Sequence, residues 1–266
     1  MDDQYYFSQI PRDIQRIIFL KTEPRDLDTL CNSNTEISQL CFNKKLLDEY
    51  LNIYNLNFRP HKLHKITETN SSILIAHVIN QLRKSNIQWE MIFMDLIHNY
   101  ILQQDGKDEN IVEVLDILHN QENFILQEQT VVELARYAIE RNRDMVLNWL
   151  FDNYDINYSL LVVELLNHRY VPPLAKDYAN KLLDIIIEEN INVDWPAIIE
   201  IILSNFHFDI FDKIMSSNII DKNLAIKYLR DTIDNVAEGR YIYPYCRTYS
   251  EDMEKLIEKL KELEEL

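Results

Sequence analysis

The feature that most limits the fold of this chain is its glycine content, because its 266 residues include only two glycines. A dinucleotide-binding fingerprint needs three closely spaced glycines, and a phosphate-binding P-loop needs two. Tight β-hairpins rely on turns such as Asn-Gly, in which glycine adopts a positive φ angle at little cost. The sequence therefore excludes these motifs. Its 47% hydrophobic and 27% charged residues instead predict an all-α protein with a sizeable core.

The charge balance argues against nucleic acid as a partner. The chain has 27 basic and 44 acidic side chains, which give a formal charge of −17 at pH 7. Proteins that bind phosphate backbones carry clustered Lys and Arg, whereas the longest basic tract here is the sparse segment 59–65. We interpret that segment as a solvated linker, with an anion or partner site as the alternative.

No segment has the pattern of a targeting or membrane-spanning sequence. The N-terminal residues Met1 to Gln4 have neither the basic nor the apolar region of a signal peptide. No apolar run approaches the roughly 20 residues of a membrane span. We therefore expect a cytoplasmic protein without a membrane partner, with the nucleus as a second option.

Three cysteines, Cys31, Cys41 and Cys246, form an odd number without metal-type spacing, which suits a reducing compartment. A zinc site that combines Cys31 and Cys41 with His61 and His64 would have suitable ligand types. However, the nine residues between the first two cysteines fit no common zinc motif, and both cysteines fall on apolar helix faces. The prediction is no metal and no cofactor.

Residues 10–54 have the pattern of short helices with tight corners. Pro11 suits the first turn of a helix, and the isoleucines that follow it recur at helical spacing. A Pro-x-Asp-Leu turn then leads into a second helix. The positions that carry the pattern are Ile10-Pro11, Asp13-Ile14, Ile17-Ile18, Pro24-Arg25-Asp26-Leu27, Leu30-Cys31, Ile37, Leu40-Cys41 and Leu46-Leu47.

This order of residues resembles the F-box over about 45 residues. It departs from that family at its end, where Leu46-Leu47-Asp48-Glu49-Tyr50 replaces the usual tryptophan-containing element. The resemblance implies docking on the Skp-type linker of a cullin–RING ubiquitin ligase. The alternative is a small helical cap with no function of its own. The residues expected to dock are Ile10, Pro11, Ile14, Ile18, Leu27 and Leu30, some of which must also form the core of the module.

From residue 70 onward, an apolar pair at spacing i, i+4 recurs near the end of successive helices. Successive pairs start 32, 37 and 28 residues apart, which is close on average to the 33 residues of an ankyrin repeat. A polar tail follows each of the last three pairs, with Asn153, Asn190 and Asn218 in step. The pairs are Val114/Leu118, Val146/Leu150, Leu183/Ile187 and Phe211/Met215.

These units resemble degenerate ankyrin repeats, and residues 134–150 look like an ankyrin helix pair with its tight turn. The usual Thr-Pro-Leu-His opening and turn glycine are absent, apart from Gly106 at a plausible turn. We expect Asn and Asp to occupy the positive-φ positions that glycine takes in typical repeats. Helical hairpins of another solenoid type are the alternative.

The predicted organisation has four parts: an F-box-like helical module at 1–60, a linker helix in 61–88, degenerate ankyrin-like repeats at 89–249 and a C-terminal capping helix at 250–266. The linker helix is expected at 71–84. The helix pairs are expected at 90–103 with 110–120, 130–141 with 144–153, 158–168 with 176–189, 195–204 with 207–217, and 222–236 with 250–265. We interpret the last helix as a cap rather than part of a coiled coil, because its apolar spacing extends over only two heptads, which are too few to indicate a coiled coil. Its apolar residues are Met253, Leu256, Ile257, Leu260 and Leu263.

No catalytic constellation can be assembled from the sequence. Neither a Gly-x-Ser-x-Gly nucleophile elbow nor a His-Glu-x-x-His metal motif occurs. The seven histidines are scattered, and we interpret them as helix-end or surface residues. Carboxylates are too numerous for one acid–base pair to be singled out. The prediction is that the protein is not an enzyme.

Together, the two resemblances imply a protein–protein interaction adaptor, a monomer outside its complex, whose repeats present an unknown target for ubiquitin transfer. An F-box-like module followed by ankyrin-like repeats, in a chain rich in Ile and Asn, is similar to families of giant DNA viruses of protists. Clustered tyrosines in the loop 239–248 either contact a partner or cover an end of the core. The candidate target contacts are Tyr154, Asn157, Tyr158, Asn192 and Trp195.

Two alternatives to this function belong to different classes. One is a helical-repeat scaffold or inhibitor without any connection to ubiquitin, in which the N-terminal segment is only a cap. The other is an acidic mimic that occupies the nucleic-acid site of a basic protein. The negative charge is dispersed along the chain, which argues against the mimic.

Overall fold

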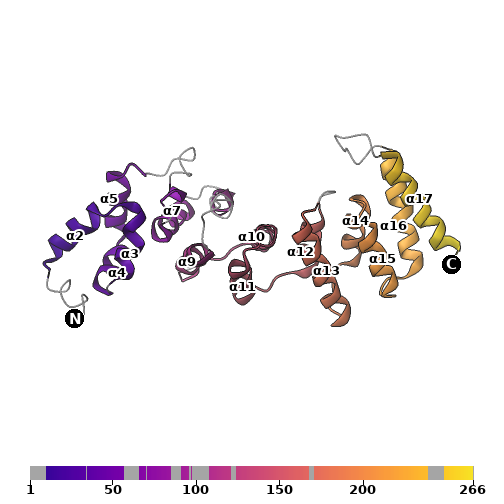
Figure 1. The fold of residues 1–266 in the computed structure, drawn as a ribbon, viewed down its shortest axis with the longest axis horizontal. Helices are drawn as coiled ribbons and strands as arrows, with labels where there is room; N and C mark the ends of the chain where they lie inside the picture. Colours follow the sequence, from indigo (N-terminus) through magenta and orange to yellow (C-terminus); the bar gives the residue numbers. More distant parts are fainter. Residues whose placement is uncertain are drawn as a thin grey trace. The chain divides into compact units, whose positions relative to one another are not determined.

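The structure of this chain, a computed structural model, describes residues 10–33, 35–56, 66–69, 71–84, 91–95, 97, 108–120, 124–167, 171–238 and 249–265. Across these ranges the regular elements are helices, which confirms the predicted all-α class. The chain divides into two compact units, Met1–Asn153 (unit 1) and Tyr154–Leu266 (unit 2). Figure 1 labels the helices of both units. The finer division into module, linker, repeats and cap stays a prediction.

The first helices of unit 1 begin where the local sequence favours it. Pro11 precedes α2 with a φ angle of −52°, and Pro24 opens the 3-10 helix η1. The Asn43 side chain accepts a hydrogen bond from the Leu46 N–H at 3.2 Å and so caps α5. These elements are α2 (Arg12–Lys21), η1 (Pro24–Asp26), α3 (Leu27–Asn32), α4 (Thr35–Cys41) and α5 (Lys44–Ile53).

These helices enclose a small core around Tyr50. The Tyr50 ring meets the Phe19 ring edge-on, with centroids 5.4 Å apart, and both side chains are fully buried. The Tyr50 hydroxyl donates a hydrogen bond to the Thr22 carbonyl at 2.7 Å. Burial raises the pKa of the Tyr50 phenol, so the hydroxyl keeps the proton that it donates.

A disulfide joins Cys31, near the end of α3, to Cys41, the last residue of α4. Both residues lie on buried faces, as their apolar neighbours in the sequence predicted. The odd cysteine count did not predict the pairing, because spacing along the chain does not show that two helix ends face one another. A zinc site would need both cysteines as free thiolates, and its other two ligands, His61 and His64, lie outside the described residues.

Helix α7 (Ser72–Lys84) connects this module to the rest of unit 1, because it packs against both α5 and α9 (Asp108–His119). Every residue from Ser72 to Ile79 is buried. The structure thus confirms the helix predicted at 71–84. Residues 91–95 are also helical, within the range where a helix is predicted.

Helices α10 (Glu128–Glu140) and α11 (Asp144–Asn153) form a pair joined by a tight turn. Both agree with the predicted bounds within two residues. Asn142 in the turn has a φ angle of 54°, and the next N–H, of Arg143, donates to the Ala138 carbonyl at 2.8 Å. This is a Schellman motif, whose left-handed residue is usually glycine. Asparagine takes the glycine position here, as predicted.

In the part of unit 2 that the structure describes, the helices form three pairs. The first helices of the pairs, α12, α14 and α16, pack against one another in a row (Figure 1). Ion pairs connect the second helices, from Lys176 of α13 to Asp209 of α15 at 2.7 Å and from Lys259 of α17 to Asp212 of α15 at 3.0 Å. The helices are α12 (Tyr158–Leu166), α13 (Pro173–Glu188), α14 (Trp195–Ser204), α15 (Phe208–Ser216), α16 (Lys222–Ala237) and α17 (Tyr249–Glu265).

Positive φ angles mark the ends of helices in unit 2. Asn190 and Asn218, which follow α13 and α15, have φ angles of 52° and 57°, as predicted. Asn153 was expected in step with them but is the last residue of α11, and its side chain donates to the Trp149 carbonyl at 2.8 Å. Phe206, between α14 and α15, has a φ angle of 61°. Its residue type gives no indication of this conformation.

Several side-chain contacts within each unit join residues at a similar spacing along the chain. The contacting residues lie 33 to 35 positions apart, and each of these contacts joins equivalent parts of successive helix pairs. This spacing agrees with the period of about 32 residues predicted from the apolar pairs, while their identification as ankyrin repeats stays a prediction. The contacts are Arg143 with Asp108 and Trp149 with Asp116 in unit 1, and Asp194 with Ser159 and Lys213 with Asn180 in unit 2.

The last helix, α17, packs on α16, as a capping helix would. Leu256 is fully buried, whereas the next residue, Ile257, is 37% exposed. Among the helices that the structure describes, none combines the length and the apolar character that a bilayer crossing requires.

Candidate protein-interaction surfaces

Helix α2 exposes large apolar side chains on one face. Ile14 is 45% exposed and Ile17 is 48% exposed, and at spacing i, i+3 they lie side by side, with Pro11 one turn earlier. The opposite face is buried through Gln15 and Phe19. We call Pro11, Ile14 and Ile17 the α2 strip. Burial of these side chains by a partner would remove apolar surface from water, which is the largest favourable contribution to association.

The six predicted docking residues separate into three groups in the structure. Pro11 and Ile14 are exposed and belong to the α2 strip, whereas Ile10, Ile18 and Leu30 are half-buried. Leu27 is fully buried and is therefore a core residue rather than a contact. The sequence prediction omitted Ile17, although its spacing from Ile14 was a signal that could have included it.

A half-buried carboxylate attaches the N-terminal helices to α7. Asp28 of α3 accepts hydrogen bonds from the Ser71 hydroxyl and the Ser72 N–H, both at 2.5 Å, and so caps α7 from outside that helix. Burial raises the pKa of Asp28 despite these two bonds, and the nearby Glu113 carboxylate adds to the rise. The cap is therefore a tertiary contact that depends on where α3 lies.

A histidine makes the second connection between the module and α7. His77 Nε2 lies 2.8 Å from the Asp48 carboxylate of α5, and Gln81 donates to the same carboxylate. The His77 side chain is only 8% exposed, so its interpretation as a helix-end or surface residue is wrong. Burial lowers the pKa of His77 and outweighs the opposing effect of Asp48.

Serine, histidine and aspartate occur together at this junction without the geometry of a catalytic triad. The Ser71 hydroxyl donates to Asp28, and the Ser72 hydroxyl donates to the Asn110 carbonyl at 3.1 Å. A triad requires the serine hydroxyl to donate to the histidine ring. These side chains therefore connect helices.

In unit 2, two of the predicted target contacts occupy matching positions on neighbouring helices. Tyr158 and Trp195 are each the first residue of a helix, α12 and α14, and both are half-buried. The residue before Trp195, Asp194, donates its N–H at 3.0 Å to the hydroxyl of Ser159, the residue after Tyr158. This bond brings the two aromatic residues to the same edge of unit 2. We call Tyr158 and Trp195 the aromatic edge.

The other predicted target contacts lie in the connections beside this edge. Tyr154 is half-buried, while Asn157 and Asn192 are exposed. Asn157 also has a structural role, because its side chain caps α12 by accepting from the Leu160 N–H at 3.1 Å. Its replacement would therefore affect the helix as well as any contact.

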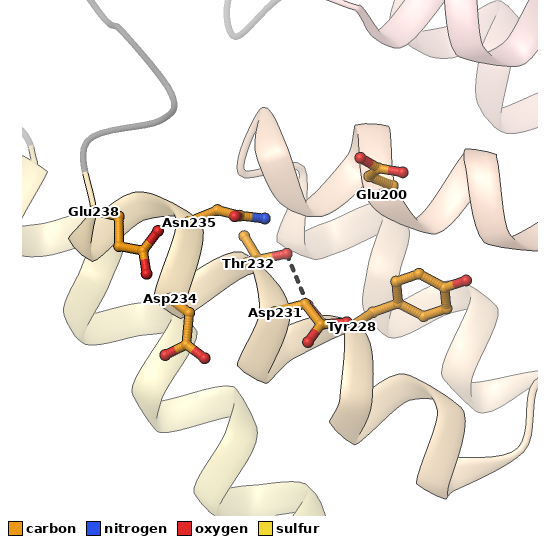
Figure 2. Close-up of a pocket in the computed structure, with 7 residues that line it drawn as sticks. All are labelled: Glu200, Tyr228, Asp231, Thr232, Asp234, Asn235 and Glu238. Atoms are coloured by element: carbon orange, nitrogen blue, oxygen red, sulfur yellow. Dashed lines mark hydrogen bonds between the residues drawn. The ribbon is translucent and has the colours of Figure 1, made fainter.

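The surface of unit 2 also contains an acidic groove, with a cavity of about 450 Å³, between α14 and α16 (Figure 2). The residues that line it include four carboxylates and neither Lys nor Arg. The Thr232 hydroxyl donates to the Tyr228 carbonyl at 2.8 Å, within α16. Such a groove favours cationic side chains of a partner by charge complementarity. Its lining residues are Glu200, Tyr228, Asp231, Thr232, Asp234, Asn235 and Glu238.

This groove is not among the surfaces predicted from the sequence. Its signal is the recurrence of polar residues on one face of α16, at positions 228, 231, 232, 235 and 238. Many exposed helices carry a similar stripe of charge, so the pattern becomes specific only once α14 places Glu200 beside it. The tyrosine-rich loop 239–248 and Gly106 lie outside the described residues.

Among the described residues, no group of three or more His, Cys, Asp or Glu side chains could hold a metal ion. Comparisons with protein-family models, with curated proteins and with solved structures find no match to this chain.

Proposed function

We propose that this protein is a protein–protein interaction adaptor that docks on a Skp-type subunit of a cullin–RING ubiquitin ligase and presents a target protein through its helical repeats. The observation that carries the proposal is the α2 strip, where Ile14 and Ile17 face solvent while the opposite side of the same helix enters the core. A helix that is apolar on both faces is suited to two interfaces, one within the module and one with a partner.

The docking contribution of the α2 strip follows from its apolar area. Full burial of an isoleucine side chain contributes about 1.5–3 kcal/mol. The ion pair between Arg16 and Glu49 connects α2 to α5, and the strip is therefore presented on a helix that the module holds in place. A preorganised helix loses little conformational entropy when a partner binds.

Unit 2 supplies the surface for the target. The aromatic edge offers large side chains with polar tips, a combination common in binding hot spots. The acidic groove adds a preference for a target segment with Lys or Arg. With no chemistry of its own in this role, the adaptor would act by holding enzyme and target together, which raises their effective concentration.

Binding to a purified Skp-type adaptor tests the docking half. The full chain is compared with an Ile14→Asp/Ile17→Asp variant by calorimetry. Because both side chains are exposed, the variant is expected to fold and to lose at least about 100-fold in affinity. Ile125→Asp is the matched control, since Ile125 is 75% exposed in unit 1 but lies outside the strip. Equal binding by the double variant, or no binding by the wild-type chain, contradicts the proposal.

The second candidate function is a helical-repeat scaffold without a connection to ubiquitin, whose N-terminal helices only cap the stack. The contacts of Asp28 with Ser71 and Ser72, and of Asp48 with His77, favour this candidate because they fasten the module onto α7. A scaffold predicts that Ile14→Asp/Ile17→Asp leaves target binding intact and that no Skp-type adaptor binds the wild-type chain.

A further inference from the structure

Helix α3 is attached to two other helices by side chains on adjacent turns. Cys31 forms the disulfide with Cys41 of α4, and Asp28, three residues earlier, caps α7 through Ser71 and Ser72. Residues at spacing i, i+3 lie on the same side of a helix. One short helix thus carries both a covalent link and the acceptor on which the first turn of α7 depends.

Neither α3 nor α4 has the length to persist by itself. They span six and seven residues, whereas isolated helices shorter than about 12 residues are marginal in water. Beyond the disulfide, burial of side chains such as Leu27 and Ile37 holds them in place. The position of Asp28 therefore depends on a small core and one covalent bond.

We propose that the Cys31–Cys41 disulfide is a redox-sensitive lock that controls the docking of α3 on α7. In the oxidised form, the bond holds α3 against α4 and keeps the Asp28 carboxylate at the N-terminus of α7. In the reduced form, α3 and α4 open locally, and the Ser72 N–H loses its acceptor. The lock belongs to unit 1 and does not depend on which partner the protein binds.

Small-molecule thiols supply the reductant. A thiolate attacks one of the two cysteine sulfurs and forms a mixed disulfide, while the other cysteine leaves as a thiolate and takes up a proton. A second thiol then displaces the protein sulfur, so that two cysteine thiols and one small-molecule disulfide result. Cys31 is 2% exposed and Cys41 is fully buried. Reduction by a thiol therefore requires local opening of α3 and α4.

The test uses the full chain with Cys246→Ser, which leaves only the paired cysteines. Alkylation in denaturant, followed by intact-mass measurement, is expected to add no adduct to the protein as purified and two adducts after dithiothreitol. Hydrogen exchange is then compared between the two forms. Exchange is expected to become at least tenfold faster in residues 27–41 and in the first turn of α7 on reduction, and to stay unchanged in residues 195–216 of unit 2.

Two variants distinguish loss of the disulfide-dependent cap on α7 from a nonspecific loss of stability in unit 1. Cys31→Ala/Cys41→Ala is expected to exchange like the reduced form and to be insensitive to dithiothreitol. Asp28→Ala is expected to exchange quickly in the first turn of α7 in both redox states. Two adducts without reductant overturn the proposal, because the bond then does not form. Reduction of the Cys246→Ser chain without faster exchange in α7 also overturns it, whether or not the other variants fold.

Discussion

Unit 1 and unit 2 are both helical, but different kinds of contact join their helices. The N-terminal part of unit 1 uses contacts that occur once and are fully or partly buried: a disulfide, the Asp28 cap on α7 and the His77–Asp48 pair. Unit 2 uses repeated contacts at its surface, where capped helix starts alternate with ion pairs such as Lys176–Asp209. Repeated contacts tolerate the loss of one member, whereas a single buried contact has no substitute.

This difference explains where the periodic pattern of the sequence is visible. Helix pairs that pack against their neighbours through equivalent contacts need similar residues at equal spacing. That requirement produces a repeat in the sequence. In unit 1, contacts at this spacing between successive helix pairs join the later helices, through Arg143–Asp108 and Trp149–Asp116. The four predictions that follow test the contrast, beginning with the largest expected effect.

Core truncations test whether the two units are separate cooperative bodies. Tyr50→Ala in unit 1 is expected to lower the free energy of unfolding by about 3–5 kcal/mol, and Ile202→Ala in unit 2 by about 2–5 kcal/mol, because both side chains are fully buried. Native-state hydrogen exchange should rise only in the unit that carries the substitution. Loss of protection in both units from either variant would contradict the division.

Two substitutions, each of which removes one partner of an ion pair, test whether a partly buried ion pair contributes more to stability than an exposed one. Arg143 and Asp108 are 19% and 17% exposed, whereas Lys176 and Asp209 are 35% and 60% exposed. Arg143→Met is expected to cost about 1.5–3 kcal/mol, since it strands a partly buried carboxylate. Lys176→Met should cost less than about 1 kcal/mol.

Urea denaturation in low salt and in 1 M NaCl measures both variants. The effect of Lys176→Met should vanish in high salt, where the Debye length is about 3 Å, and that of Arg143→Met should persist. Equal effects in the two variants would show that burial does not decide how much these two ion pairs contribute to stability.

The positive-φ asparagines test a feature that both units share. Asn142→Ala in unit 1 and Asn190→Ala in unit 2 are each expected to cost about 1 kcal/mol, because a β-carbon is strained in the left-handed region. Asn142→Gly and Asn190→Gly are the matched controls and should be neutral or slightly stabilising. Calorimetric melting of the four variants gives the answer. A glycine variant less stable than its alanine counterpart would show that the asparagine side chain, rather than the backbone, matters.

The stability of unit 1 should depend on pH through His77, a contribution that is not expected in unit 2. The pKa of His77 lies below its ordinary value of 6.5 in the folded protein, owing to burial. His77 therefore binds a proton more readily in the unfolded chain than in the folded protein, and the free energy of unfolding decreases as the pH falls below about 6.5. Besides Asp48, the charged groups around His77 are Lys44 and Lys84.

Thermal melting of wild type and His77→Gln between pH 7.5 and 5.5 measures this contribution. The wild-type protein should lose more thermal stability than His77→Gln over that range, and the difference should appear in hydrogen exchange of α7 but not of unit 2. Parallel pH profiles for the two proteins would rule out a contribution from His77.

Much of the helical layout was predictable because it depends on local chemistry. Proline at a helix start, asparagine at a turn and apolar residues at spacing i, i+4 all act within one or two turns. Leu183 and Phe211 of the predicted apolar pairs are buried, while Ile187 and Met215 are half-buried. The pattern therefore located the buried side of each helix but not how far burial extends along it.

The parts that sequence could not predict depend on which helices meet. Leu27 and Ile14 are both apolar residues of the predicted docking set, yet one is core and the other is exposed. His77 was misassigned because nothing around it in the chain shows that α5 places Asp48 beside it. The acidic groove likewise requires α14 and α16 together. Even Phe206, with its positive φ angle, has a conformation set by the packing of α14 and α15 rather than by its residue type.

By itself, the sequence determined the all-α class, the approximate bounds of most helices and the exclusion of glycine-dependent phosphate sites. Those features follow from backbone and side-chain preferences that act over a few residues. The tertiary structure alone decided the disulfide, the attachment of α3 and α5 to α7, and the division of apolar residues between the core and the α2 strip. Each of these joins residues far apart in the chain, and the free energy of such contacts exists only when the fold brings the partners together.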